Sequence, residues 1–137
     1  MLRPILLFLS LSFFGHIVFS QNECFPFQIG NGFCLSKDGR TAYISKPTGK
    51  SDNSGKPIYG IYQSIFNEEN TWSEPEPVSF GDARYTEYRP ILNDENDKLF
   101  FISRRPEPET KEPVAYGNLW YVQRTNNGWS QPIFLAS

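Results

Sequence analysis

The sequence has one histidine, one methionine and two cysteines among 137 residues, and its net charge at pH 7 is only −2. The single histidine, His16, lies in an apolar N-terminal stretch. Without another histidine, a Ser-His-Asp triad or a His-ligated zinc site is excluded for the rest of the chain. The mildly acidic charge disfavours bulk binding to nucleic acid or to an anionic membrane. We expect no cofactor, no metal and no nucleic-acid partner.

The one long apolar run lies within the first 20 residues. It follows a single cationic side chain, Arg3, and spans residues 5–14. Val18 and Ser20, a β-branched and a small residue, stand at positions −3 and −1 of a cleavage site ahead of Gln21. This pattern is typical of a secretory signal peptide. An uncleaved anchor is the alternative, but the run is shorter than the ~20 residues that span a bilayer. We predict that residues 1–20 are removed, leaving an exported protein, periplasmic or extracellular, with no membrane span.

Two cysteines, Cys24 and Cys34, follow this segment. In an exported chain, an even number of cysteines favours a disulfide. The bridge would close a loop of about ten residues and stabilise the fold by ~2–3 kcal/mol in the loop-entropy picture. The alternative is two reduced, buried thiols.

The rest of the chain contains an internal repeat of 57 to 58 residues. Three blocks recur in the same order. Residues 35–46 match 93–104, residues 61–62 match 119–120, and residues 70–75 match 127–132. The first two blocks are offset by 58 and the third by 57. One residue is therefore missing from a polar turn of the second unit, where length changes are tolerated. The conserved order of the blocks indicates a duplicated structural unit.

Each unit has the pattern of β-structure. The dipeptide Asp38-Gly39 is a hairpin signal before a β-prone run, and Asn96-Asp97 takes its place in the second unit. The expected later elements are loops at 47–56 and 106–113, strands at 58–66 and 116–124, and final strands at 77–80 and 132–135. Short strands at regular spacing, without a 3.6-residue period, predict an all-β repeat array.

The run Ser-Lys-Asp-Gly-Arg-Thr-Ala-Tyr-Ile-Ser at residues 36–45 resembles the motif S-P-D-G-K-x-L-x-F-x-S of TolB-type, WD-like β-propeller repeats. The Trp-Ser-x-Pro elements at Trp72 and Trp129 are similar to a version found in exported bacterial proteins. In the second unit Asp94 stands at the motif's serine. The resemblance implies antiparallel four-stranded blades, arranged as an N-terminal segment (21–31), blade 1 (32–80), a connection (81–88) and blade 2 (89–137).

Two blades do not close a propeller, because such rings have four to eight. The resemblance therefore predicts an incomplete ring. We expect either a fragment with missing blades, a truncated reading frame, or self-association that completes the ring between chains.

Several repeat residues have structural roles in this interpretation. Asp38 is expected to bond nearby backbone amides of its turn rather than act as an active-site carboxylate. Trp72 and Trp129 are expected to fill the contact between neighbouring blades rather than stack on a ligand. The turn that contains Asn96 and Asp97 is acidic, but it lacks the glycine and the twelfth-position glutamate of a helical calcium loop, and we predict a solvated hairpin.

The connection between the units carries the candidate ligand-binding residues, which are Arg84, Tyr85, Glu87, Tyr88 and Arg89. Arginine can bind a carboxylate or phosphate through two hydrogen bonds, and tyrosine supplies flat contact area with a polar tip. The resemblance implies that such connections lie near one mouth of a central channel. The alternative is internal Arg–Glu pairing with aromatic packing.

These residues favour an exported binding module without catalysis of its own, whose partner is a protein, a peptide or a glycan. The alternative is a fragment of a propeller hydrolase, either glycosidase- or sialidase-like or associated with a peptidase. A glycosidase can use paired carboxylates without histidine. The sialidase box S-x-D-x-G-x-T-W, however, has a residue between Asp and Gly that residues 36–41 lack.

Overall fold

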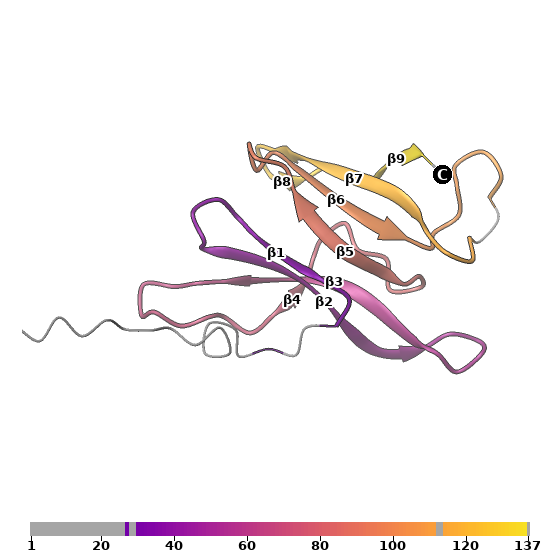
Figure 1. The fold of residues 1–137 in the computed structure, drawn as a ribbon, viewed down its shortest axis with the longest axis horizontal. Coiled ribbons are helices and arrows are strands. Elements are labelled where there is room, and N and C mark those ends of the chain that lie inside the picture. Colours follow the sequence, from indigo (N-terminus) through magenta and orange to yellow (C-terminus); the bar gives the residue numbers. More distant parts are fainter. Residues whose placement is uncertain (1–26, 28–29, 112–113, 137) are drawn as a thin grey trace, which may run out of the picture.

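The computed structural model describes residues 27, 30–111 and 114–136, which form two antiparallel β-sheets (Figure 1). The predicted signal peptide, Cys24 and most of the segment 21–31 lie outside the described residues. The described part of the chain contains strands and no helix, so the predicted all-β class is confirmed. No helix that could cross a membrane is found in that part.

The first sheet has four strands in sequential order, and neither sheet closes on itself. Its strands are β1 (Phe33–Leu35), β2 (Thr41–Ser51), β3 (Pro57–Ile65) and β4 (Glu76–Pro77). Strand β2 runs on to Ser51 through a shift in register after Pro47. The first half of the loop predicted at 47–56 is therefore strand, and residues 52–56 form the turn.

The second sheet repeats this meander. Its strands are β5 (Glu87–Leu92), β6 (Lys98–Ser103), β7 (Asn118–Thr125), β8 (Gly128–Trp129) and β9 (Ile133–Ala136). Strands β5, β6, β7 and β9 correspond to β1 to β4, and β8 pairs with the end of β7. Because β5 begins at Glu87, the last two residues of the connection predicted at 81–88 belong to a strand.

The hairpin turns before β2 and β6 are equivalent, but their offset is 57 and not the predicted 58. Gly39 has φ of +70° and Asn96 has φ of +57°, so these two residues occupy the same left-handed position. The Ser36 hydroxyl accepts a hydrogen bond from the amide of Thr41, as the Asn93 side chain does from that of Lys98. Asn93, rather than Asp94, therefore stands at the motif's serine.

The turns before the last strands are equivalent as well. The Ser73 amide donates a hydrogen bond to the Ile65 carbonyl, and the Ser73 hydroxyl accepts one from the Ile65 amide. Ser130 makes the same two hydrogen bonds with Gln123. These pairs reproduce the predicted offsets, 58 in the third strand and 57 in the Trp-Ser element.

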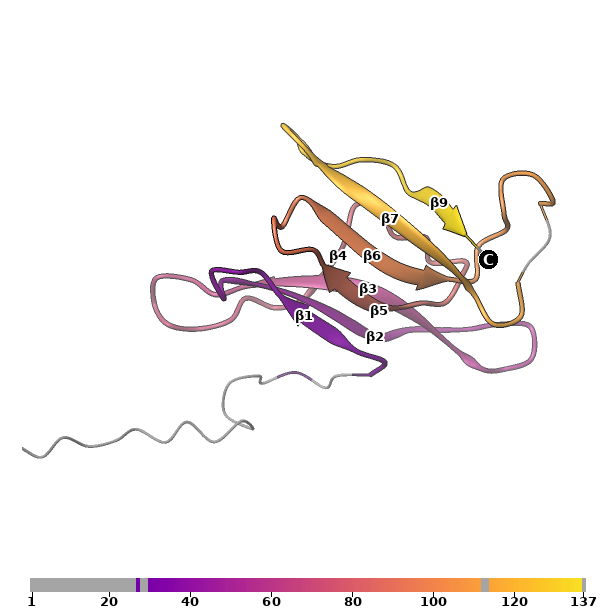
Figure 2. The same cartoon turned by 45° about the horizontal axis from the view of Figure 1, so that its top comes forward.

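The core lies between the two sheets, which pack face to face (Figure 2). Its buried members are Tyr43, Ile61, Val78 and Phe80 from the first unit, and Leu99, Phe101, Trp120 and Val122 from the second. Each fully buried large apolar side chain contributes about 1.5–3 kcal/mol to folding. The packing of one sheet on the other holds the connection between them in place.

Candidate functional site

Glu87, the first residue of β5, is buried at the junction between the two sheets with 1% of its surface exposed. Its carboxylate forms an ion pair with Arg105. It also accepts hydrogen bonds from the Ser103 hydroxyl at 3.2 Å and from the backbone amide of Asp82 at 3.2 Å. Glu87 therefore joins the connection to the end of β6 and is not open to a ligand.

Arg105 completes this internal cluster. Its guanidinium lies over the rings of Phe101 and Trp120, at 5.6 and 5.2 Å from their centroids, and donates to the carbonyl of Phe80 at 3.3 Å. Burial raises the pKa of Glu87 above its ordinary value, and the neighbouring Arg105 opposes that rise. The internal Arg–Glu pairing weighed for this connection exists, but its arginine comes from beyond β6.

Arg84 and Tyr85 lie on the exposed side of the connection. Arg84 forms an ion pair with Asp82 at 2.7 Å and lies 5.3 Å from the centroid of the Tyr85 ring. The hydrogen bond from Arg84 holds the pKa of the Asp82 carboxyl below its usual range. Because the Arg84 side chain is 77% exposed, this pair is screened by water and leaves the guanidinium accessible.

Arg89 contacts the segment before β1, and Tyr88 contacts the segment before β7. Arg89 has φ of +54° and donates its amide to the carbonyl of Asn31 at 3.0 Å. Its guanidinium lies 6.0 Å from the Tyr88 ring, and the Tyr88 hydroxyl donates to the carbonyl of Tyr116 at 2.8 Å. The five predicted residues thus have different neighbours, and only Arg84 and Tyr85 line a common cavity.

That cavity, here called the arginine pocket, has a volume of about 360 Å³. Its lining residues are Asp52, Ile58, Arg84, Tyr85, Thr86, Arg104, Val114 and Ala115. The Nε of Arg104 is buried and has no hydrogen-bond partner among the described residues. No local pattern distinguishes Arg104 from the other loop charges, because its place beside Arg84 depends on how the two sheets pack.

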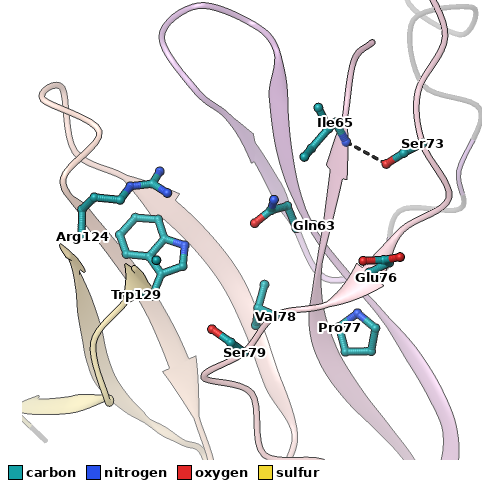
Figure 3. Close-up of a pocket in the computed structure, with 10 residues that line it drawn as sticks. Gln63, Ile65, Ser73, Glu76, Pro77, Val78, Ser79, Arg124 and Trp129 are labelled. Carbon is teal, nitrogen blue, oxygen red and sulfur yellow. Dashed lines mark hydrogen bonds between the residues drawn. The ribbon is translucent and has the colours of Figure 1, made fainter. Parts of the chain in front are cut away.

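A second hollow of about 300 Å³ lies between the sheets at the opposite end of β3 and β7 (Figure 3). Trp129 and Arg124 form one wall, with the guanidinium 4.0 Å from the indole centroid. Gln63 and Glu76 stand on the opposite wall, from β3 and β4. Sequence reasoning missed this hollow, which joins residues from both units.

Trp129 lies across the interface between the two sheets, and Trp72 has a different neighbour. The Trp129 ring packs edge-on against Tyr43 and Phe80, and its Nε1 donates to the Tyr43 hydroxyl at 3.3 Å. Trp72 packs on Phe66 of its own sheet, with centroids 5.2 Å apart.

The turn residues bond locally. The Asp38 carboxylate accepts from the amide of Arg40 at 3.0 Å and from the Ser36 hydroxyl, which lowers the pKa of Asp38. The Asn96 side chain accepts from the amide of Lys37 at 3.1 Å, and Asp97 accepts from the Asn93 amide group at 2.6 Å. These contacts occupy the turn carboxylates and link the two hairpin turns.

Within the residues that the structure describes, no three His, Cys, Asp or Glu side chains are grouped so as to hold a metal ion. Cys34 is a half-buried free thiol, and burial raises its pKa to about 11. Because Cys24 lies outside the described residues, its bridge to Cys34 stays a prediction.

Comparison with known proteins adds no relative. No protein-family model matches the chain, and neither a curated protein nor a solved structure matches it.

Proposed function

We propose that the chain is an exported β-propeller-type repeat module that binds an acidic group of a glycan, a peptide or a protein in the arginine pocket, without catalysis of its own. The observation that carries the proposal is Arg104, whose buried Nε has no partner among the described residues while its side chain lines the cavity beside Arg84. A buried donor without an acceptor costs about 1–3 kcal/mol. A carboxylate or sulfate that displaces the atoms covering this nitrogen supplies that acceptor.

The lining of the pocket supplies two guanidinium groups, Arg84 and Arg104, against one acid, Asp52. Arg84 is paired with Asp82 through its Nε and one terminal nitrogen, which leaves its other terminal nitrogen for a ligand. The Asp52 carboxylate already accepts from the amides of Ser54 and Lys56 within its own turn. Hydrogen bonds between a guanidinium and a carboxylate are about twice as strong as neutral ones, and Tyr85 adds a flat surface for the rest of the ligand.

The hydrolase alternative would use the two acids of the connection, Asp82 and Glu87, which line a common cavity of about 160 Å³. Each is held in an ion pair with an arginine, and Glu87 is 1% exposed. A glycosidase needs one carboxyl that can deliver a proton and another that faces the sugar or a water molecule.

The test is a binding screen of the purified protein against paired probes. Uronic-acid and sulfated oligosaccharides are compared with neutral oligosaccharides of the same backbone, and Asp/Glu-rich peptides with their amidated counterparts. We expect acidic probes to bind and neutral ones not to. The variants Arg84→Gln and Arg104→Gln should each weaken binding at least tenfold, and added salt should weaken it as well.

Arg40→Gln is the matched control, because Arg40 is an exposed arginine of the β1–β2 turn, outside the pocket lining. It should leave binding unchanged. Equal affinity for acidic and neutral probes, or equal loss in all three variants, would refute the proposal. Hydrolysis of any probe would instead revive the hydrolase alternative.

A further inference from the structure

The face of the second sheet that points away from the first is apolar and open. Exposure alternates along β6. Leu99 and Phe101 are buried, whereas Phe100 and Ile102, which follow them in turn, are partly exposed. The outward side chains of the neighbouring strands include Ile91, Leu119, Tyr121, Ile133 and Leu135, here grouped with Phe100 and Ile102 as the outer face. Ile91 is 60% exposed and Leu135 is 49% exposed.

The repeat shows what such a face is built to do. With the offsets of 57 in β2 and β4 and 58 in β3, Phe100 corresponds to Tyr43, Leu119 to Ile61 and Leu135 to Val78. In the first sheet those three residues, Tyr43, Ile61 and Val78, form the core against the second sheet. The outer face therefore occupies the positions of a surface that the first unit buries under another sheet.

The outer face is also more apolar than its buried counterpart. Three polar residues of the first unit are replaced in the second by apolar or aromatic ones. Ile102 stands at the position of Ser45, Tyr121 at that of Gln63, and Ile133 at that of Glu76. A face exposed to solvent is expected to gain polar residues, because large contiguous apolar patches on monomers mark interaction sites. The Phe100 and Tyr121 rings lie side by side on this face, with centroids 5.8 Å apart and planes tilted by 33°.

We propose that the outer face packs against the outer face of a second copy of this chain, which gives a twofold-symmetric dimer. The intrachain core shows that the occupant suited to this surface is a β-sheet of the same kind. The other side of the first sheet is the rival occupant, because Phe33 and Leu35 lie there beside Ile44 and Ala42 and are 45% and 40% exposed. A contact with that side would join copies head to tail and would not stop at two. A like-with-like contact about a twofold axis closes on itself, so association stops at the dimer.

The size of the face sets the expected affinity. Four strands about 4.8 Å apart and about six residues long, at ~3.3 Å per residue, cover roughly 400 Å² of flat area. Standard interfaces bury about 800 Å² per partner, so this one belongs to the small class. We therefore expect a dissociation constant in the micromolar range, and a monomer at nanomolar concentration.

The experiment is sedimentation equilibrium of the processed protein from about 5 to 500 µM. The wild type should convert from monomer to dimer over this range, and Ile91→Glu and Leu135→Glu should each weaken dimerisation at least tenfold. Ile65→Glu is the matched control, because Ile65 is 48% exposed but belongs to the first sheet. It should dimerise as the wild type does.

Hydrogen exchange of the wild type gives an answer that needs no variant. Between 5 and 500 µM, amide protection should rise in β6, β7 and β9 and stay constant in β2. A wild type that is monomeric at 500 µM would overturn the proposal, as would an equal loss of dimer in Ile65→Glu. Assembly beyond the dimer would overturn the twofold contact.

Discussion

Replacing Arg105 with Met should destabilise the fold more than any surface change, because it leaves the Glu87 carboxylate buried without its counter-charge. Methionine keeps an apolar stem against Phe101 and Trp120, which the guanidinium now covers. The change therefore isolates the charge and its hydrogen bonds from the packing. It removes the ion pair with Glu87 and the hydrogen bonds to Ser103 and Phe80.

The magnitude follows from burial on both sides of the pair. The Glu87 side chain is 1% exposed and the Arg105 side chain 13%, so water can solvate neither group well. Removing one partner of such a pair costs about 3–5 kcal/mol. At roughly 4 °C per kcal/mol for a domain of this size, Tm should fall by about 12 °C or more. The double variant Glu87→Leu/Arg105→Met, which leaves no buried charge, should recover most of that loss.

The loss should also depend on pH. Burial raises the pKa of Glu87 while Arg105 lowers it, so removing Arg105 raises this pKa further. A carboxyl with a raised folded-state pKa binds more protons in the folded than in the unfolded state, and its effect on stability becomes less favourable as pH rises through that window. The difference between Arg105→Met and wild type should therefore be largest near pH 8 and shrink toward pH 4, by about 1.4 kcal/mol per unit of pKa change.

Urea unfolding followed by tryptophan fluorescence at several pH values measures this difference. Arg40→Met serves as the control, since an exposed arginine should change the free energy of unfolding by under about 0.5 kcal/mol. If Arg105→Met lost less than about 1 kcal/mol at pH 7, with the pH profile of the wild type, the buried pair would not stabilise the junction as argued.

Three further predictions concern the turns, the tryptophans and the thiol. Gly39→Ala should cost about 1–2 kcal/mol in urea unfolding, because φ is +70° and the new Cβ meets no neighbour, so strain alone acts; no loss would contradict the left-handed turn. Trp129→Ala should lower Tm more than Trp72→Ala, because only Trp129 packs on the Tyr43 and Phe80 rings across the core; the reverse order would contradict that packing. In the reduced protein, Cys34 should alkylate roughly 100-fold more slowly at pH 8 than a thiol of ordinary pKa, since burial raises its pKa to about 11; rapid labelling of the reduced native protein would contradict this. Labelling of both Cys24 and Cys34 in denaturant without reductant would exclude the predicted disulfide.

The all-β class and the order of the strands could be predicted from local patterns. The hairpin signals and the alternating apolar runs depend on residues within a few positions of each other, and the structure places strands where they occur. The offset of the first block was misplaced by one residue because Asp97 and Asn96 are both turn formers. Only the positive φ of Asn96 shows which of them occupies the place of Gly39.

The candidate site was predicted in part. Arg84 and Tyr85 line the arginine pocket, whereas Glu87 is buried against Arg105, which the sequence did not suggest as its partner. Arg104 and Arg105 are adjacent and chemically identical. One lines a cavity and the other enters the core, since successive residues after a strand point to different sides.

The sequence alone determined a duplicated β-unit, because turn chemistry and hydrophobic alternation are local properties that each unit carries by itself. Tertiary structure decided everything that depends on two units meeting. It selected Arg105 as the partner of Glu87, brought Arg104 beside Arg84, and left one of two equivalent apolar faces open. The physical reason is that burial and charge pairing depend on which surfaces touch, and no spacing within one unit specifies that contact.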